Sequence, residues 1–398
     1  MFVIGAGFSA PAKIPIQNRI LKEITKPSTD SILTFEPESE SVKFMLSFIK
    51  VGLYLLQNYS RNDCADEISS FTDIEKKYIN SDVNDPIPWT NQYREVQILK
   101  ERVRLKLEKS DLQISLEDIF TSFDKSYQHK EYLYQHSYYH ANEIKESIMR
   151  LFVYYFCKCT NNHTFDLPEY IDFCNYIQSL GNVTIISTNW DVLIEEYFNR
   201  QKIEYSLCLN EPYFTPSKTE TDKSEPSKVN LIKLHGSINW FKCLNCGTLN
   251  IIDNKNCGIF LFEDSATECC NQCNQEVSDG LLLQSEIITP TMIKSINSQL
   301  YNNLWSTAKR DLREAVSVTF IGYSLPIADF ELRYLLQRCI PHDIAIDVVL
   351  HSSDNPKNTE LPYLQSLLPE KRYRDLFVKN DPTFFYNGFA DYFKRKLK

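Results

Sequence analysis

Short apolar runs rich in β-branched residues recur along the chain, and such runs are typical of strands buried in a sheet. They occupy residues 1–4, 182–188, 229–235, 316–322 and 346–350. Helical patterns stand beside them, at residues 17–26, 168–180, 191–199 and 329–338. Strands that alternate with helices indicate a parallel sheet covered on both faces, so we predict a Rossmann-like, doubly wound α/β fold.

A long stretch between the first two predicted strands, from about residue 41 to 159, has a helical pattern instead. Segment 91–108 spaces its apolar residues three and four positions apart, and residues 115–118 resemble a capping box at a helix start. The most apolar stretch, residues 44–56, is too short to span a bilayer and contains polar positions, so we expect a core helix there. Two prolines within residues 85–88 predict a turn. This region is therefore predicted to be an all-helical insertion.

The composition excludes several classes of protein. The chain has 398 residues, of which 43% are hydrophobic and 24% are charged, as is usual for a globular protein and not for a disordered one. Its net charge is −9, so no overall positive field attracts nucleic acid or an anionic membrane, and we expect neither as a direct partner. The first residues show no secretory signal, which predicts a cytoplasmic protein.

The cysteines indicate a metal site. Twelve cysteines in a chain without an export signal favour metal ligation and buried thiols over a disulfide framework. The chain has two Cys-x2-Cys pairs, Cys243 with Cys246 and Cys270 with Cys273. Two such pairs suit tetrahedral ligation of zinc, and four thiolates leave no open position, so we predict a structural zinc. Reduced thiols without metal are the alternative; Cys257 and Cys269 are spare, and Cys269 could replace Cys270.

A glycine-rich turn follows the first predicted strand. Residues 5–10 read Gly-Ala-Gly-Phe-Ser-Ala and fit the G-x-G-x-x-A pattern between a strand and a helix. In that pattern Gly5 permits a tight turn, Gly7 allows a diphosphate to approach the backbone, and the helix N-terminus offers amides to the anion. The acidic ribose-binding residue expected about twenty positions later is missing, so an ordinary glycine turn is the alternative.

Three further polar segments, at residues 187–191, 234–237 and 322–325, follow predicted strands. Because ligand sites in open α/β sheets lie outside the carboxyl ends of the strands, all of these segments can face one crevice. Together with the glycine-rich turn they resemble the motifs of the sirtuin family, roughly G-A-G-x-S, [QT]-N-x-D, H-G and G-x-S, in the same order. The T-N-W-D and K-L-H-G-S segments resemble most closely the bacterial sirtuin-like branch, in which a helical insertion follows the first motif.

The resemblance implies a role for each matching residue. Asn189 would orient the reacting ribose and the attacking water, Asp191 would contact the nicotinamide carboxamide, and His235 would be the general base. The candidates for binding the diphosphate and adenosine of NAD are Gly5, Ala6, Gly7, Ser9, Thr188, Gly322, Ser324, Ser352 and Asp354. The alternatives are that Asn189 caps a helix beginning at Trp190, that Asp191 interacts with the dipole of its first turn, and that His235 is structural. Sirtuins also carry a zinc module at the position of the cysteine pairs.

One departure from the family pattern bears on the activity. Protein-deacylating sirtuins continue the first motif with G-I-P-D-F-R, whereas residues 13–18 here read Lys-Ile-Pro-Ile-Gln-Asn. The leading prediction is therefore an NAD hydrolase that releases nicotinamide and ADP-ribose. An NAD-dependent protein deacylase and a non-catalytic NAD- or ADP-ribose-binding assembly module are the alternatives.

The resemblance to the bacterial branch further implies an NAD-depleting effector of anti-phage defence that forms a homo-oligomer and works with a HerA-type ATPase. Two segments are candidate partner surfaces: the aromatic block at residues 132–156 and the basic residues 394–398. The alternatives for them are an intramolecular core and a solvated terminus.

The chain is expected to divide into three parts. The NAD-binding α/β domain is assembled from residues 1–30, 165–242 and 276–398. It is interrupted by the helical insertion at residues 31–164 and by the zinc module at residues 243–275. Residues 215–228 are predicted to be an exposed polar loop because they are rich in Ser, Thr, Lys and Glu.

Overall fold

The computed structural model describes residues 1–14, 20, 42–61, 63–79, 89–110, 112, 115–134, 136–209, 228–253, 270, 272–273, 283–294, 298–355 and 368–397. Most of the helix expected at residues 17–26, the turn at residues 85–88 and nearly all of the loop at residues 215–228 lie outside the described residues.

A parallel sheet forms the centre of the molecule. Across this sheet lie, in order, β10 (Thr383–Phe385), β9 (Ala345–Val349), β8 (Ser317–Ile321), β1 (Phe2–Ile4), β2 (Val183–Ser187), β4 (Val229–Lys233) and β3 (Tyr205–Ser206). Every pairing in it is parallel. The predicted doubly wound fold is confirmed, with the first strand at the centre and later strands added on both sides.

Helices cover both faces of this sheet because the strand residues alternate between two apolar clusters. Phe2 packs its ring edge-on against Phe173, with centroids 5.7 Å apart. Val3, which points the other way, belongs to the cluster that contains Leu304 and Leu336. The helices around the sheet are α8 (Pro168–Ser179), α9 (Leu193–Arg200), α11 (Gln299–Arg313), α12 (Phe330–Cys339), α14 (Pro369–Leu376) and α15 (Gly388–Lys396).

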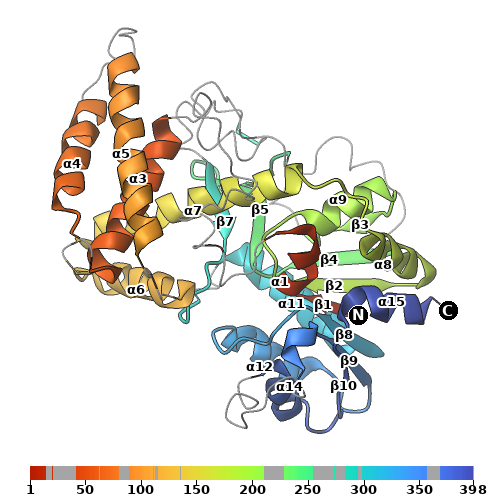
Figure 1. The fold of residues 1–398 in the computed structure, drawn as a ribbon. Coiled ribbons are helices and arrows are strands. Elements are labelled where there is room, and N and C mark those ends of the chain that lie inside the picture. The colour runs from red at the N-terminus through yellow and green to blue at the C-terminus, as the bar shows by residue number, and fades with distance from the viewer. Residues whose placement is uncertain are drawn as a thin grey trace.

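The described residues between β1 and β2 are mostly helical, as predicted. Figure 1 shows its first helices standing beside the sheet, with the last one running toward it. They are α3 (Val42–Tyr59), α4 (Ala65–Ile79), α5 (Trp89–Lys109), α6 (Leu116–His129) and α7 (Tyr138–Asn161). Ser115 caps α6 by accepting a hydrogen bond from the Asp118 amide at 3.1 Å, which the sequence predicted. No helix within the described residues is both long enough and apolar enough to cross a bilayer.

A small antiparallel sheet follows directly on β4. It consists of β5 (Gly236–Cys243), flanked by β6 (Leu249–Ile251) and β7 (Leu283–Ile287). The sequence predicted one strand through residue 235, but β4 ends at Lys233 because the chain turns sharply there. Gly236 permits this turn: its φ is +77°, and a side chain there would lie 2.1 Å from the Glu286 carbonyl oxygen.

Candidate active site

The predicted site segments all follow carboxyl ends of the parallel strands. Residues 5–9 come after β1, residues 188–191 after β2, and residues 234–237 after β4. Residues 322–324 come after β8, and residues 352–354 form a short 3-10 helix beyond β9. Because these strands are parallel, their carboxyl ends share one edge of the sheet, which is where a doubly wound fold binds its ligands.

The glycine-rich turn packs against the turn after β8. A Cβ on Gly7 would lie 2.7 Å from the Gly322 Cα, and the Gly7 amide donates to the Gly322 carbonyl at 2.8 Å. Gly322 has a φ of +60°, so it also needs glycine's conformational freedom. These contacts give both glycines a structural role that does not depend on a bound diphosphate.

The helix after this turn differs from the one expected. Helix α1 (Ala6–Ser9) has four residues and continues as the 3-10 helix η1 (Ala10–Ala12), so its dipole is short. The amides of Gly5, Gly7 and Phe8 already donate to backbone carbonyls within the protein. The turn therefore offers an anion fewer free amides than the sequence pattern predicted.

Ser9, Asn189 and Asp191 form one buried hydrogen-bonded group. The Ser9 hydroxyl donates to Asp191 Oδ2 at 2.9 Å, and Asn189 Nδ2 donates to Ser9 Oγ and to the Gly5 carbonyl, each at 3.0 Å. All three side chains are nearly inaccessible to solvent. Burial raises the pKa of Asp191, against the lowering effects of nearby Lys233 and Ser9. The fold thus brings together polar residues from the segments that follow β1 and β2.

The structure excludes a helix-capping role for Asn189 and supports a contact of Asp191 with the first turn of α9. Helix α9 begins at Leu193 with Val192 as its N-cap, so Asn189 does not cap it. Asp191, however, accepts a hydrogen bond from the Leu193 amide at 3.1 Å. Asp191 therefore supports the start of α9 in addition to its contact with Ser9.

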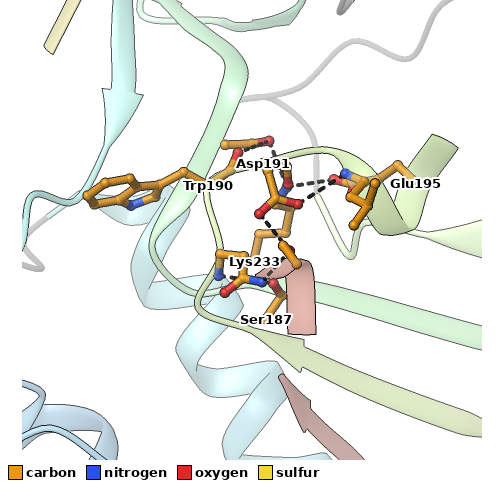
Figure 2. A network of polar contacts seen from close by, with 9 residues as sticks. Ser187, Trp190, Asp191, Glu195 and Lys233 are labelled. Carbon is orange, nitrogen blue, oxygen red and sulfur yellow. Dashed lines mark hydrogen bonds and ion pairs between the residues drawn. The ribbon is translucent and has the colours of Figure 1, made fainter. Parts of the chain in front are cut away.

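A fully buried lysine connects this loop to the next strand (Figure 2). Lys233 Nζ donates to the Asp191 carbonyl and to Glu195 Oε1, both at 2.6 Å, and to Ser237 Oγ at 2.8 Å. Ser237 in turn lies 3.3 Å from the Trp190 carbonyl. The ammonium thus fixes residues after β2, the first turn of α9 and the start of β5 relative to one another.

His235 lies in the turn between β4 and β5. Its carbonyl accepts from the Ile288 amide at 2.9 Å, and its side chain is 9% exposed. Burial first, and then the charge of Lys294, lower its pKa to about 4, although Asp329 opposes this effect. The imidazole is therefore neutral at pH 7 and can accept a proton.

The ring faces two charged residues that the sequence did not single out. His235 Nε2 lies 3.3 Å from Lys294 Nζ and 3.6 Å from Asp329 Oδ1. Lys294 also forms an ion pair with Asp329, whose Oδ2 accepts from the Tyr323 hydroxyl at 2.9 Å. Burial would raise the pKa of Asp329, but His235, Lys294 and Tyr323 together lower it.

The outer candidates are more open to solvent. Thr188 is partly buried and donates to the Ile4 carbonyl at 3.2 Å. Ser324 is exposed, and its carbonyl accepts two hydrogen bonds from the Arg372 guanidinium, at 2.8 and 3.0 Å. Ser352 is exposed and Asp354 is partly buried. These residues occupy the same edge of the sheet, and their contact with adenosine stays a prediction.

The four predicted zinc ligands come together. Their sulfur atoms all lie within 4.8 Å of one another, with Cys246 and Cys270 3.4 Å apart and Cys243 and Cys273 3.9 Å apart. Sulfur atoms on a tetrahedral zinc are separated by roughly 3.8 Å, given Zn–S bonds of about 2.3 Å. Gly247, at φ +77°, forms the turn beside the first pair. The cluster could hold zinc; Cys257 and Cys269 lie outside the described residues.

A comparison with protein-family models finds a similarity over part of the chain. Residues 183–343, which include β2, β4 and β8, match the model of the SIR2-like domain family. None of the curated proteins compared with the chain matches it.

Similar solved structures include "Sir2 bound to acetylated peptide", with 15% identity over 57% of this chain and 68% of that one and a TM-score of 0.30. A Sir2 homologue in complex with ADP-ribose has 13% identity over 100% and 92% of the two chains and a TM-score of 0.37. With TM-scores this low, these structures carry no argument, and the similarity to the SIR2-like domain rests on the family match over residues 183–343.

Proposed function

We propose that this chain binds NAD at the carboxyl edge of its parallel sheet and hydrolyses it to nicotinamide and ADP-ribose. The SIR2-like segment supports the use of NAD, because it contains the Asn189, Asp191 and His235 motifs in their family order. The observation that favours catalysis is the position of the buried His235 at the same sheet edge as the Asn189–Asp191 loop.

The chemistry follows from these groups. Cleavage of the bond between nicotinamide and ribose leaves positive charge on the ribose, which fixed dipoles in a dry pocket stabilise. Asn189 orients the ribose and the water, and Asp191 contacts the carboxamide of the leaving group. As the water oxygen bonds to the ribose carbon, His235 accepts its proton and nicotinamide leaves with the bonding electron pair.

The test is to incubate the purified protein with NAD and quantify nicotinamide and ADP-ribose. Asn189→Ala and His235→Ala should each lower turnover by about a hundredfold to ten-thousandfold. Lys309→Met, an exposed change on α11, is the matched control that should leave turnover unchanged. Full turnover in both site variants would refute the assignment.

Two product patterns would identify the alternatives. Formation of O-acyl-ADP-ribose from an acylated peptide, without hydrolysis in its absence, would indicate a protein deacylase. Binding of NAD or ADP-ribose without any release of nicotinamide would indicate a non-catalytic module. Both patterns would overturn the hydrolase proposal.

We also propose that the activity serves anti-phage defence in the cytoplasm, in a homo-oligomer that works with a HerA-type ATPase. The support is the resemblance to the bacterial branch. Much of the aromatic block at residues 132–156 is buried in the hydrophobic core. Tyr132 and Tyr139 are 74% and 66% exposed, so they are the candidates for contact with another subunit. In the basic tail, Arg395 and Lys396 already pair with Asp391 and Asp347. A strict monomer by light scattering, with no growth defect on expression, would contradict this proposal.

A further inference from the structure

His235 Nε2 faces a buried ion pair, Lys294 with Asp329, that has no role in the proposed chemistry. Lys294 comes from the segment after β7, and Asp329 lies immediately before α12. Their side chains are 3% and 10% exposed. The buried Tyr323 hydroxyl also donates to Asp329 and so helps to fix the position of this carboxylate.

We propose that Lys294 and Asp329 are positioning residues that hold His235 as a neutral imidazole with its proton on Nδ1. A lysine ammonium has only donors, so the His235 Nε2 that lies 3.3 Å from it must accept. The ring proton is then on Nδ1, and Nε2 is the basic atom, which takes a proton from water when Lys294 releases this hydrogen bond.

Both Lys294 and Asp329 are needed to set the protonation state of His235, because their charges act on the ring in opposite directions. Lys294 disfavours a proton on His235, whereas Asp329 favours one. An unpaired ammonium this deeply buried would be costly, and Asp329 compensates its charge. The two charged side chains and the Tyr323 hydroxyl bound to Asp329 thus set the protonation state of the base together.

The helical insertion holds the segment that carries Lys294. The Met292 amide donates to Thr121 Oγ1 of α6 at 2.9 Å, and Thr291 Oγ1 lies 3.4 Å from the same hydroxyl. At its other end the segment is fixed by the hydrogen bond from the Ile288 amide to the His235 carbonyl. A displacement of α6 would therefore move Lys294 relative to the base.

The first experiment needs no turnover. In ¹⁵N-labelled full-length protein, the two ring nitrogens of His235 report the tautomer, and His235→Gln identifies the signal. The expected result at pH 7 is a neutral ring with its proton on Nδ1. In Lys294→Met the Nδ1–H tautomer should lose its dominance and the pKa of His235 should rise, whereas Lys294→Arg should restore the wild-type pattern and Lys309→Met should leave it unchanged.

The second experiment uses the proposed NAD cleavage, on which this part of the inference rests. In Lys294→Met the acid limb of the kcat/KM profile should move upward by about one pH unit, with a smaller change in KM. A wild-type ring with its proton on Nε2, or a His235 titration unchanged in Lys294→Met, would overturn the positioning role. Absence of turnover in the wild type would instead overturn the proposed function. The tautomer measurement would then decide alone whether Lys294 and Asp329 position His235.

Discussion

Polar side chains beside the sheet could be predicted only where they follow a recognisable strand. Asn189 and His235 follow apolar runs, so their place at one edge of the sheet can be deduced from the sequence. Lys294 and Asp329 have no such signal, because their segments have no strand pattern and they meet His235 only in the folded chain. Lys233 could have been singled out, because it is a charged residue within the apolar run 229–235. A lysine in a buried strand needs hydrogen-bond acceptors.

The first residue-scale prediction concerns Lys233. Lys233→Met should lower the free energy of unfolding by about 3–5 kcal/mol, because it leaves the buried Glu195 carboxylate and the Asp191 carbonyl without their donor. Urea unfolding followed by fluorescence measures this. The double variant Lys233→Met/Glu195→Leu removes the stranded carboxylate and should recover part of the loss; a single variant as stable as the wild type would contradict the ion pair's role.

The second residue-scale prediction is a pH dependence of stability. The pKa of His235 falls from 6.5 in the unfolded chain to about 4 in the fold, so between these values the unfolded state binds the extra proton. The free energy of unfolding should therefore fall by up to about 3 kcal/mol as the pH drops from 6.5 toward 4. Unfolding curves of wild type and His235→Gln across this range isolate the effect; parallel pH profiles would argue against it.

At the scale of the element, the central strands are predictable because they are buried on both faces and read as continuous apolar runs. The edge strands β3 and β10 have two and three residues and show no comparable run. The small sheet escaped prediction for a different reason: the residues of β5 pair with residues of β7 that lie forty or more positions later in the chain. Such a pairing depends on tertiary contacts, which a local pattern does not record.

The contact between the turns after β1 and β8 gives the first element-scale prediction. Gly322→Ala should cost about 1–3 kcal/mol or more, because Gly322 has a φ of +60° and its new methyl group would lie 2.3 Å from the Gly7 carbonyl carbon. Gly181→Ala is the matched control, since nothing lies within 4 Å of the methyl group there. Thermal unfolding of both variants tests this, and equal losses would show that the close contact is not the cause.

The second prediction at this scale concerns zinc binding by the cluster of Cys243, Cys246, Cys270 and Cys273. We expect one zinc per chain, released by a strong chelator and absent from Cys243→Ser/Cys246→Ser, because four converging thiolates form a complete tetrahedral site. Metal analysis of freshly purified protein measures the content. Cys208→Ser, which lies outside the cluster, should retain the metal. Zinc-free wild-type protein, or full retention in the double variant, would contradict the site.

At the scale of the whole molecule, the helical insertion and the sheet share one apolar core. Trp190, which follows β2, contacts Phe152 and Phe156 of α7 with ring centroids 6.3 and 6.0 Å apart. The same cluster of buried residues extends from α3 to the strand residue Ile185. The predicted boundary near residue 164 therefore separates two patterns in the sequence but does not separate two hydrophobic cores.

This continuity predicts that the two regions unfold together. Far-UV circular dichroism is dominated by the helices. In a Trp89→Phe background, which removes the tryptophan at the start of α5, fluorescence reports on Trp190, Trp240 and Trp305, which lie in or beside the α/β region. Since loss of either region would expose the apolar surface of the other, both signals should show one transition at the same urea concentration. Phe156→Ala, which removes one side of the shared contact, should weaken this coupling. Early loss of the helical signal in the Trp89→Phe protein, with unchanged tryptophan fluorescence, would show that the insertion is an independent folding unit and that its contact with Trp190 contributes little to stability.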